Sequence, residues 1–293
     1  MHGLTEVTDG AQQFEEYCAR KTREALAASL HHLTTEEDTS QRFPVRPIGN
    51  EWTRRLYDGF FHVFEPPPAT PAVSLVFVQS REGNTAADDP AELGGGPTDK
   101  HLIYEGLTRV AADAVLAGAK TISGEMFFSV WHPELVALRA ELGLPRHPAQ
   151  IVVTGRGAID VRGTLLFNVP DARVFLIASL EARRALEPSI RQRPWISILD
   201  LANDPRQPLE QLRRTWNIRR ISLVGGRTTA TRFIDAELVQ DMCLTTTSKS
   251  AGQPGTPFYS GSDPPKLERL VRKRSDQPDA PFVFDHFAVS PRH

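Results

Sequence analysis

The chain has 293 residues, with 34 Lys and Arg against 36 Asp and Glu and a formal net charge of -2. This balance predicts neither a nucleic acid nor an anionic membrane surface as a partner. Hydrophobic residues make up 40% and charged residues 24%, which is typical of a soluble globular protein, and no apolar run is long enough for a membrane-spanning helix. The first residues lack the basic-then-apolar order of a signal peptide, so we expect a cytoplasmic protein.

The sequence predicts no metal site and no disulfide. The two cysteines, Cys18 and Cys243, form no CxxC pair and no cluster with other ligand residues. The pair His31-His32 lies at the end of a predicted helix without an acidic or thiol partner at ligand spacing, so we expect it to be solvated. His286 alternates within the last predicted strand, and we expect its side chain to be exposed.

The first 45 residues are predicted to be a helical extension, with the main domain at 46–293. Residues 11–33 have apolar side chains near one face of a helix and a high alanine content. A polar stretch follows, and the prolines in 43–49 then favour an extended or loop conformation.

Strands and helices are predicted to alternate along most of the main domain. The predicted strands are 72–80, 113–121, 149–155, 172–179, 195–201, 219–226, 241–248 and 281–290, and the predicted helices are 99–111, 133–145, 208–218 and 230–240. This order predicts an α/β fold with a mainly parallel sheet flanked by helices. The last strands have no helix between them and could be antiparallel at one edge.

Small, hydroxyl and basic residues follow several predicted strands. Ser80, Thr121, Thr154 and the stretch 225–229 all stand at such ends, where parallel sheets bind ligands. Backbone N–H groups, hydroxyls and a helix N-terminus together suit phosphate. An isolated Gly-Gly is more often an ordinary turn, however, and the chain has no GxGxxG after a strand and no P-loop. From these residues alone, both interpretations stay open.

Four segments in order carry a family resemblance. They are SREGNTA (80–86), LTRVAADAVLAGAKTISGE (107–125), RRISLVGGRTT (219–229) and FIDAELVQDMCLTTTSKSAG (233–252). With them, the chain resembles the reductase domain of riboflavin biosynthesis, which has a dihydrofolate-reductase-like fold. The resemblance implies an NADPH-dependent reductase that reduces the ribosyl group of a phosphoribosylamino-pyrimidine and that works as a homodimer.

The resemblance also implies roles for residues at matching positions. Arg109, Ser80 and Val224 would face the pyrimidine substrate, and Glu82 or Glu125 would assist proton delivery. The NADPH phosphates would be bound by Thr121, Gly225, Gly226, Arg227, Thr228 and Thr229, and the cofactor channel would be lined by Val78 and Thr154.

The substrate side departs from the family pattern. Val224 stands where the family has a glutamate before the two glycines, and Asn84 stands where it has a lysine. The family's substrate loop is replaced by the segment 124–148. Two alternatives therefore accompany the riboflavin-type reductase: a reductase of the same fold with another substrate, and a non-catalytic protein that binds a nucleotide or a partner.

Overall fold

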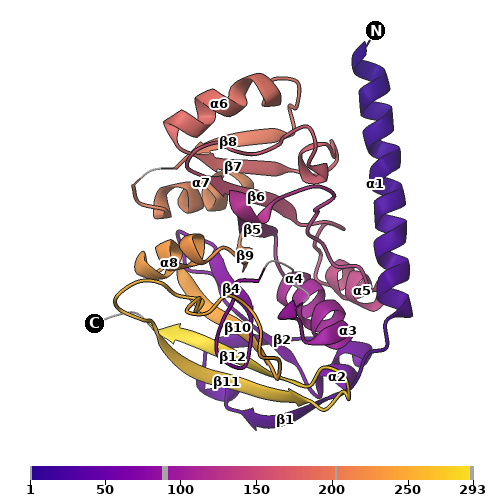
Figure 1. Ribbon diagram of the computed structural model, residues 1–293, viewed down its shortest axis with the longest axis vertical. Helices are drawn as coiled ribbons and strands as arrows, with labels where there is room; N and C mark the ends of the chain where they lie inside the picture. Colours follow the sequence, from indigo (N-terminus) through magenta and orange to yellow (C-terminus); the bar gives the residue numbers. More distant parts are fainter. Residues whose placement is uncertain (1, 88–91, 202, 291–293) are drawn as a thin grey trace.

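The computed structural model describes residues 2–87, 92–201 and 203–290, and side chains from Gly10 onward. Most of its strands belong to one large sheet (Figure 1). They are β1 (Leu33–Asp38), β4 (Ala72–Gln79), β5 (Ala114–Gly118), β6 (Ala149–Thr154), β7 (Val174–Ala178), β8 (Ile196–Asp200), β9 (Arg220–Val224), β10 (Val239–Thr247), β11 (Lys266–Ser275) and β12 (Phe282–Ser290). A separate hairpin pairs β2 (Val45–Ile48) with β3 (Phe61–Phe64).

The sheet is parallel through its centre and antiparallel at one edge. Its strand order is β1-β11-β12-β10-β4-β9-β5-β6-β7-β8. All neighbours from β10 to β8 pair in parallel, whereas β12, β11 and β1 add antiparallel pairs beside β10. The central strands β5 and β7 are buried along their whole length, as expected for apolar strands covered on both faces. The predicted fold class, including the antiparallel edge, is confirmed.

Helices cover both faces of the sheet. They are α1 (His2–Ala27), α2 (Glu51–Tyr57), α5 (Pro133–Glu141), α6 (Leu180–Ile190), α7 (Arg206–Trp216) and α8 (Arg227–Asp235), together with α3 (Gly96–Thr98) and α4 (Thr108–Val110), which a π-helical segment Asp99–Leu107 joins into one continuous helix. The side chains of α7 and α8 pack in one apolar core, and those of the continuous helix and α5 pack in the other.

Several elements were not predicted from the sequence. The polar stretch after the first helix contains β1, which pairs with β11 and ties the N-terminal extension into the main sheet. The helix α6 was also missed, although Ser179 gives an N-cap signal and accepts a hydrogen bond from Ala182 N. The predicted exposure of His286 is wrong: its side chain is 0% exposed, because the β2–β3 hairpin covers this face and the Phe61 ring stacks on the imidazole at 5.2 Å.

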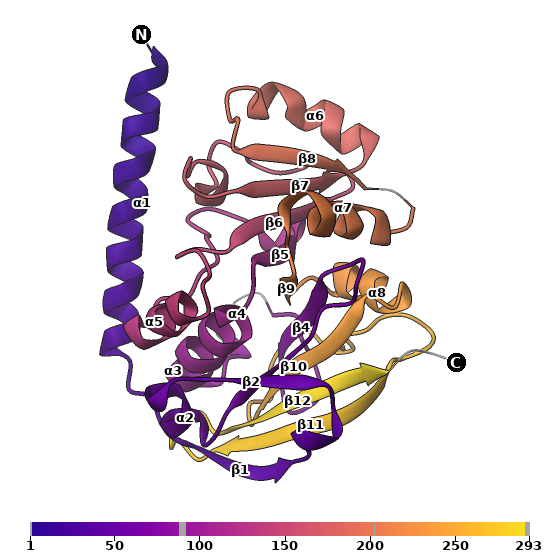
Figure 2. The same cartoon turned by 180° about the vertical axis from the view of Figure 1, so that it is seen from behind.

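The helix α1 lies along one side of the molecule, beside α5 (Figure 2). Its apolar contacts fall on the segment before α5. The Phe14 ring meets Phe127 edge-on at 4.7 Å, and Tyr17 meets Trp131 at 5.5 Å. The Tyr17 hydroxyl also donates to the Phe127 carbonyl. The helix α1 is therefore packed on the domain through Phe14 and Tyr17, and it covers part of the segment 124–148.

Two ion pairs of α1 differ in burial, and we expect them to differ in energy. Lys21 contacts Glu105 at 3.4 Å with both side chains 12% exposed, whereas Arg20 contacts Glu125 at 2.6 Å with side chains 45% and 66% exposed. Burial raises the pKa of Glu105, but its contact with His101 and the charge of Lys21 outweigh this and bring the pKa to about 2. The Glu105 carboxylate is therefore ionised at neutral pH and depends on its partners.

Removing Lys21 should therefore destabilise the fold more than removing Arg20. We expect Lys21→Met to lower the free energy of unfolding by about 2 kcal/mol at pH 7, because it leaves a buried charge with fewer partners. We expect Arg20→Ala to cost less than about 1 kcal/mol, as is usual for exposed pairs. Urea denaturation of both variants checks this, and equal losses would contradict the distinction.

Candidate cofactor and substrate site

The carboxyl ends of the central strands meet at one edge of the sheet. Val224 at the end of β9 pairs with Val76 of β4, and Leu223 pairs with Leu116 of β5. Gly118 at the end of β5 pairs with Val153 of β6. The segments that follow these strands therefore lie side by side, as the sequence predicts for a ligand-binding edge.

Five small residues converge at this edge and form what we call the glycine cradle: Gly118, Thr121, Gly225, Gly226 and Thr229. Gly225 and Gly226 have φ angles of 69° and 83°, which favour glycine. A methyl group on Gly226 would lie 3.6 Å from both the Thr121 and the Thr229 hydroxyl oxygen. A methyl group on Gly118 would lie only 2.9 Å from the Thr229 oxygen. Because the three glycines have no side chains, their backbone can lie close to the hydroxyl groups of Thr121 and Thr229.

The cradle coincides with the N-terminus of α8. Gly226 is the N-cap residue and has no side chain to accept a hydrogen bond from the first turn. The first N–H groups of a helix have no partner within the helix, and the helix dipole makes this end favourable for an anion. The cradle therefore combines N–H groups, two threonine hydroxyls and a helix N-terminus, which is a suitable set for a phosphate.

The other predicted cofactor residues make contacts outside the cradle. Arg227 Nε donates to the Pro257 carbonyl at 2.7 Å. Thr154 is buried, and its hydroxyl accepts a hydrogen bond from Gly157 N. Thr228 lines a separate open pocket of about 470 Å³ along α8. Val78 lies in β4 beyond the end of β9 and is partly exposed.

The predicted substrate residues Arg109 and Val224 are packed inside the protein. Arg109 is 2% exposed, and its guanidinium donates to the Ser129 carbonyl at 3.3 Å. It also lies over the rings of Tyr104 and Phe128, at 4.5 and 5.2 Å from their centroids. Val224 is 0% exposed and belongs to the same apolar core as Phe128. Neither side chain is presented to solvent.

The remaining candidates have partners on different elements. Ser80 is 0% exposed; its hydroxyl donates to Glu82 Oε2 and accepts from Asn84 N, so it organises the loop after β4. Hydrogen bonds from Ser250 and Ser80 lower the pKa of Glu82. Glu125 is paired with Arg20 of α1. Ser80 therefore orders the loop, Glu82 belongs to it, and Glu125 is held against α1.

Asp99 is a titratable residue near this edge that was not predicted from the sequence. It is 3% exposed at the start of the π-helical segment and accepts a hydrogen bond of 2.6 Å from the Thr245 hydroxyl. Burial raises its pKa to about 6. Thr245 is the register partner of Val78, so Asp99 is near the end of β4. Its place in a predicted helix gave no sign of burial, because an aspartate at a helix start is usually solvated.

The architecture belongs to the class of mainly parallel α/β proteins, which bind ligands at the carboxyl ends of their strands. Residues 71–279 match the model of the RibD C-terminal domain, and the chain belongs to this family. The predicted family resemblance is thereby confirmed. The helix α1 and the β2–β3 hairpin lie outside the matched residues.

Solved structures show the same fold. A pyrimidine reductase-like protein from Corynebacterium diphtheriae has a TM-score of 0.61 at 17% identity, covering 76% of this chain and 93% of that one. RibD from Acinetobacter baumannii has a TM-score of 0.55 at 16% identity, covering 76% and 59%. The riboflavin biosynthesis reductase Rib7 of Saccharomyces cerevisiae has a TM-score of 0.50 at 18% identity, covering 76% and 92%. At these identities the likeness shows the fold alone.

Comparison of the sequence with curated proteins gives no significant match. Within the described residues, no helix combines the length and the apolar character needed to span a membrane.

Proposed function

We propose that this protein is an NADPH-dependent reductase of the riboflavin-pathway type, acting on the ribosyl group of a phosphoribosylamino-pyrimidine. The glycine cradle is the observation that carries the proposal. In a chain of the RibD C-terminal family, it combines a phosphate-compatible set of groups with the edge at which parallel sheets bind ligands.

The residues of the cradle fit the cofactor's phosphates. When bound, NADPH supplies the hydride, and the protein's task is to position it against the acceptor carbon. Thr121 and Thr229 would donate hydroxyl hydrogen bonds to a phosphate between them, and the first turn of α8 would donate backbone N–H groups. Val78 and Thr154 would line the channel, and Arg227 would lie at its rim. Glu82 and Glu125 remain the proposed groups for moving a proton. We further propose a cytoplasmic homodimer.

A second candidate is a reductase of the same fold with another acceptor. The side chain of Val224 cannot accept a hydrogen bond. The guanidinium of Arg109 already contacts the Ser129 carbonyl and two aromatic rings. These observations favour an acceptor that lacks the phosphate and the polar contact of the family substrate. A third candidate, non-catalytic nucleotide binding, shares the cradle and differs only in turnover.

Binding and turnover separate the three candidates. The purified protein is titrated with NADPH and NADH by nicotinamide fluorescence, and NADPH oxidation is then followed with the riboflavin intermediate and with related pyrimidines. We expect saturable NADPH binding and oxidation with the riboflavin intermediate. Oxidation with another acceptor only would support the second candidate, and binding without turnover the third. No binding at millimolar cofactor would overturn all three.

A further inference from the structure

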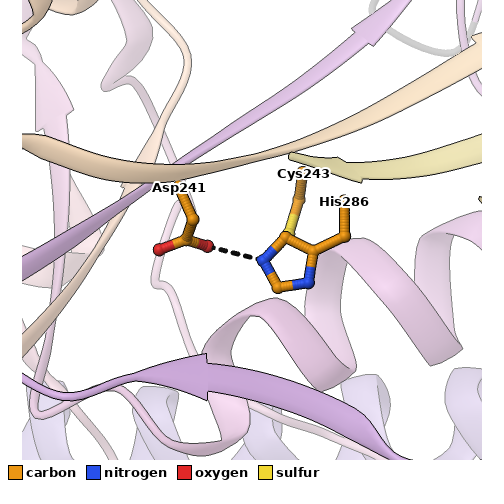
Figure 3. A group of neighbouring side chains, drawn as sticks. All are labelled: Asp241, Cys243 and His286. Carbon is orange, nitrogen blue, oxygen red and sulfur yellow. Dashed lines mark hydrogen bonds and ion pairs between the residues drawn. The ribbon is translucent and has the colours of Figure 1, made fainter. Parts of the chain in front are cut away.

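A carboxylate, a thiol and an imidazole gather on one face of the sheet, away from the glycine cradle. Asp241 and Cys243 are two residues apart in β10, so their side chains leave the same face. His286 of β12 is the direct register partner of Cys243. Their three ligand atoms all lie within 4.8 Å of one another (Figure 3). The pairing of β10 with β12 thus brings Cys243 and His286 together, although they are 43 residues apart in sequence.

The three side chains are buried and held in fixed orientations. Their exposed fractions are 2% for Asp241, 1% for Cys243 and 0% for His286. Asp241 Oδ2 lies 2.8 Å from His286 Nε2, and its other oxygen accepts a hydrogen bond of 2.8 Å from Ser74 Oγ. The imidazole stacks on Phe61 with an interplanar angle of 7°. Such support of ligand side chains by neighbouring groups is usual around protein-bound metals.

From this geometry we infer a buried zinc-type metal site formed by Asp241, Cys243 and His286. Thiolate, imidazole and carboxylate are the donors that Zn²⁺ takes in proteins. One thiolate, one carboxylate and one neutral imidazole balance a divalent cation, so the bound site would carry no net charge into the interior. Zinc bonds of about 2.0–2.2 Å require the Asp241–His286 contact to lengthen by about 0.5 Å, which a side-chain rotation can supply.

Neighbours of the triad, rather than its donor atoms, line a small cavity. Ser74 and Phe61, which contact Asp241 and His286, both line a cavity of about 20 Å³. Asp241, Cys243 and His286 do not line this cavity, so these three side chains are the ligands that the geometry assigns to the site. Because the protein donors are buried, the site would be structural, linking β10 to the antiparallel edge beneath the β2–β3 hairpin.

The two ring nitrogens of His286 have different surroundings. Within the described part of the chain, His286 Nδ1 has no hydrogen-bond partner although it is buried. A buried imidazole nitrogen without a partner is costly in an apolar surrounding. Nε2 lies 2.8 Å from Asp241 Oδ2 and is therefore the nitrogen that would bind the metal, with the proton kept on Nδ1. Without a metal, the triad is a hydrogen-bonded His–Asp pair beside a thiol.

The test uses the full chain and a spectroscopic metal. The protein is purified under reducing conditions, its zinc content is measured, and the chelator-treated protein is titrated with Co²⁺. We expect about one equivalent of bound metal per chain and a thiolate-to-cobalt charge-transfer band. The band should disappear in Cys243→Ser and persist in the matched control Cys18→Ser, which changes the other free cysteine, a partly buried residue of α1. Circular dichroism confirms that each variant is folded.

A milder variant keeps the test decisive if Cys243→Ser does not fold. Ser74→Ala removes only the hydrogen bond to Asp241, and we expect it to weaken Co²⁺ binding by about 10-fold or more while keeping the band. The inference is overturned if the wild-type protein binds neither Zn²⁺ nor Co²⁺. A charge-transfer band that persists in folded Cys243→Ser, or unchanged affinity in Ser74→Ala, would also overturn it. None of these outcomes depends on NADPH binding.

Discussion

Replacing Gly118 by valine should weaken NADPH binding by about 10- to 100-fold while the protein stays folded. The new Cβ would lie 2.9 Å from the Thr229 hydroxyl oxygen and would push this side chain out of the glycine cradle. Loss of one or two hydrogen bonds to a charged phosphate corresponds to an effect of this size. The backbone at Gly118 has φ -74° and ψ 150°, an extended conformation that valine adopts readily. Fluorescence titration with NADPH measures the change.

A glycine at the other end of the sheet gives the control. Gly143 follows α5 with φ 71°, and a Cβ there would meet no atom within 4 Å. Gly143→Ala should cost about 1 kcal/mol of stability through backbone strain. It should leave NADPH affinity unchanged, because Gly143 lies before the start of β6, whereas the glycine cradle lies at the carboxyl ends of the strands. Normal affinity in Gly118→Val, with folding verified, would show that NADPH phosphates do not use the cradle.

The cofactor edge could be predicted from the sequence because its signals are local. Gly225 and Gly226 follow an apolar strand directly, and this strand forms within the predicted range as Arg220–Val224. The helix after them begins at Arg227, three residues before its predicted start, and ends at Asp235 rather than at residue 240. Thr121 follows another strand of the same parallel sheet. Once the strands are known to be parallel, their ends meet at one edge, so convergence follows from topology without knowledge of side chains.

The surroundings of the substrate residues could not be predicted, because they depend on packing between distant segments. Arg109 looks like an available cation in the sequence, but aromatic rings from its own helix and from Phe128 enclose it. His286 follows an alternating pattern that suits an exposed position, and only the hairpin far upstream covers it. The metal triad depends on the register of β10 against β12, which no local pattern specifies.

Asp99→Asn should stabilise the protein at pH 8 by up to about 3 kcal/mol. Burial raises the pKa of Asp99 from its ordinary value of 3.8 to about 6. Between about pH 4 and pH 6 the folded state keeps a proton that the unfolded state has released, so wild-type stability falls as the pH rises through this window. Above about pH 6, the folded protein contains a buried, ionised carboxylate, and the full loss of stability is reached. Asparagine carries no charge at any pH, and its oxygen still accepts the hydrogen bond from Thr245. Its NH2 group replaces the oxygen that accepts the long 3.5 Å contact from Gly95 N, so the gain stays below the full value of about 3 kcal/mol.

Urea unfolding at pH 4 and pH 8 separates this effect from a general change in packing. The gain of Asp99→Asn over the wild type should be present at pH 8 and should vanish, or become a small loss, at pH 4, where both forms of residue 99 are neutral. The exposed Asp171 provides the matched control, because Asp171→Asn should change stability by less than about 0.5 kcal/mol at either pH. An Asp99→Asn variant less stable than the wild type at pH 8 would mean that the carboxylate is stabilised in the folded protein.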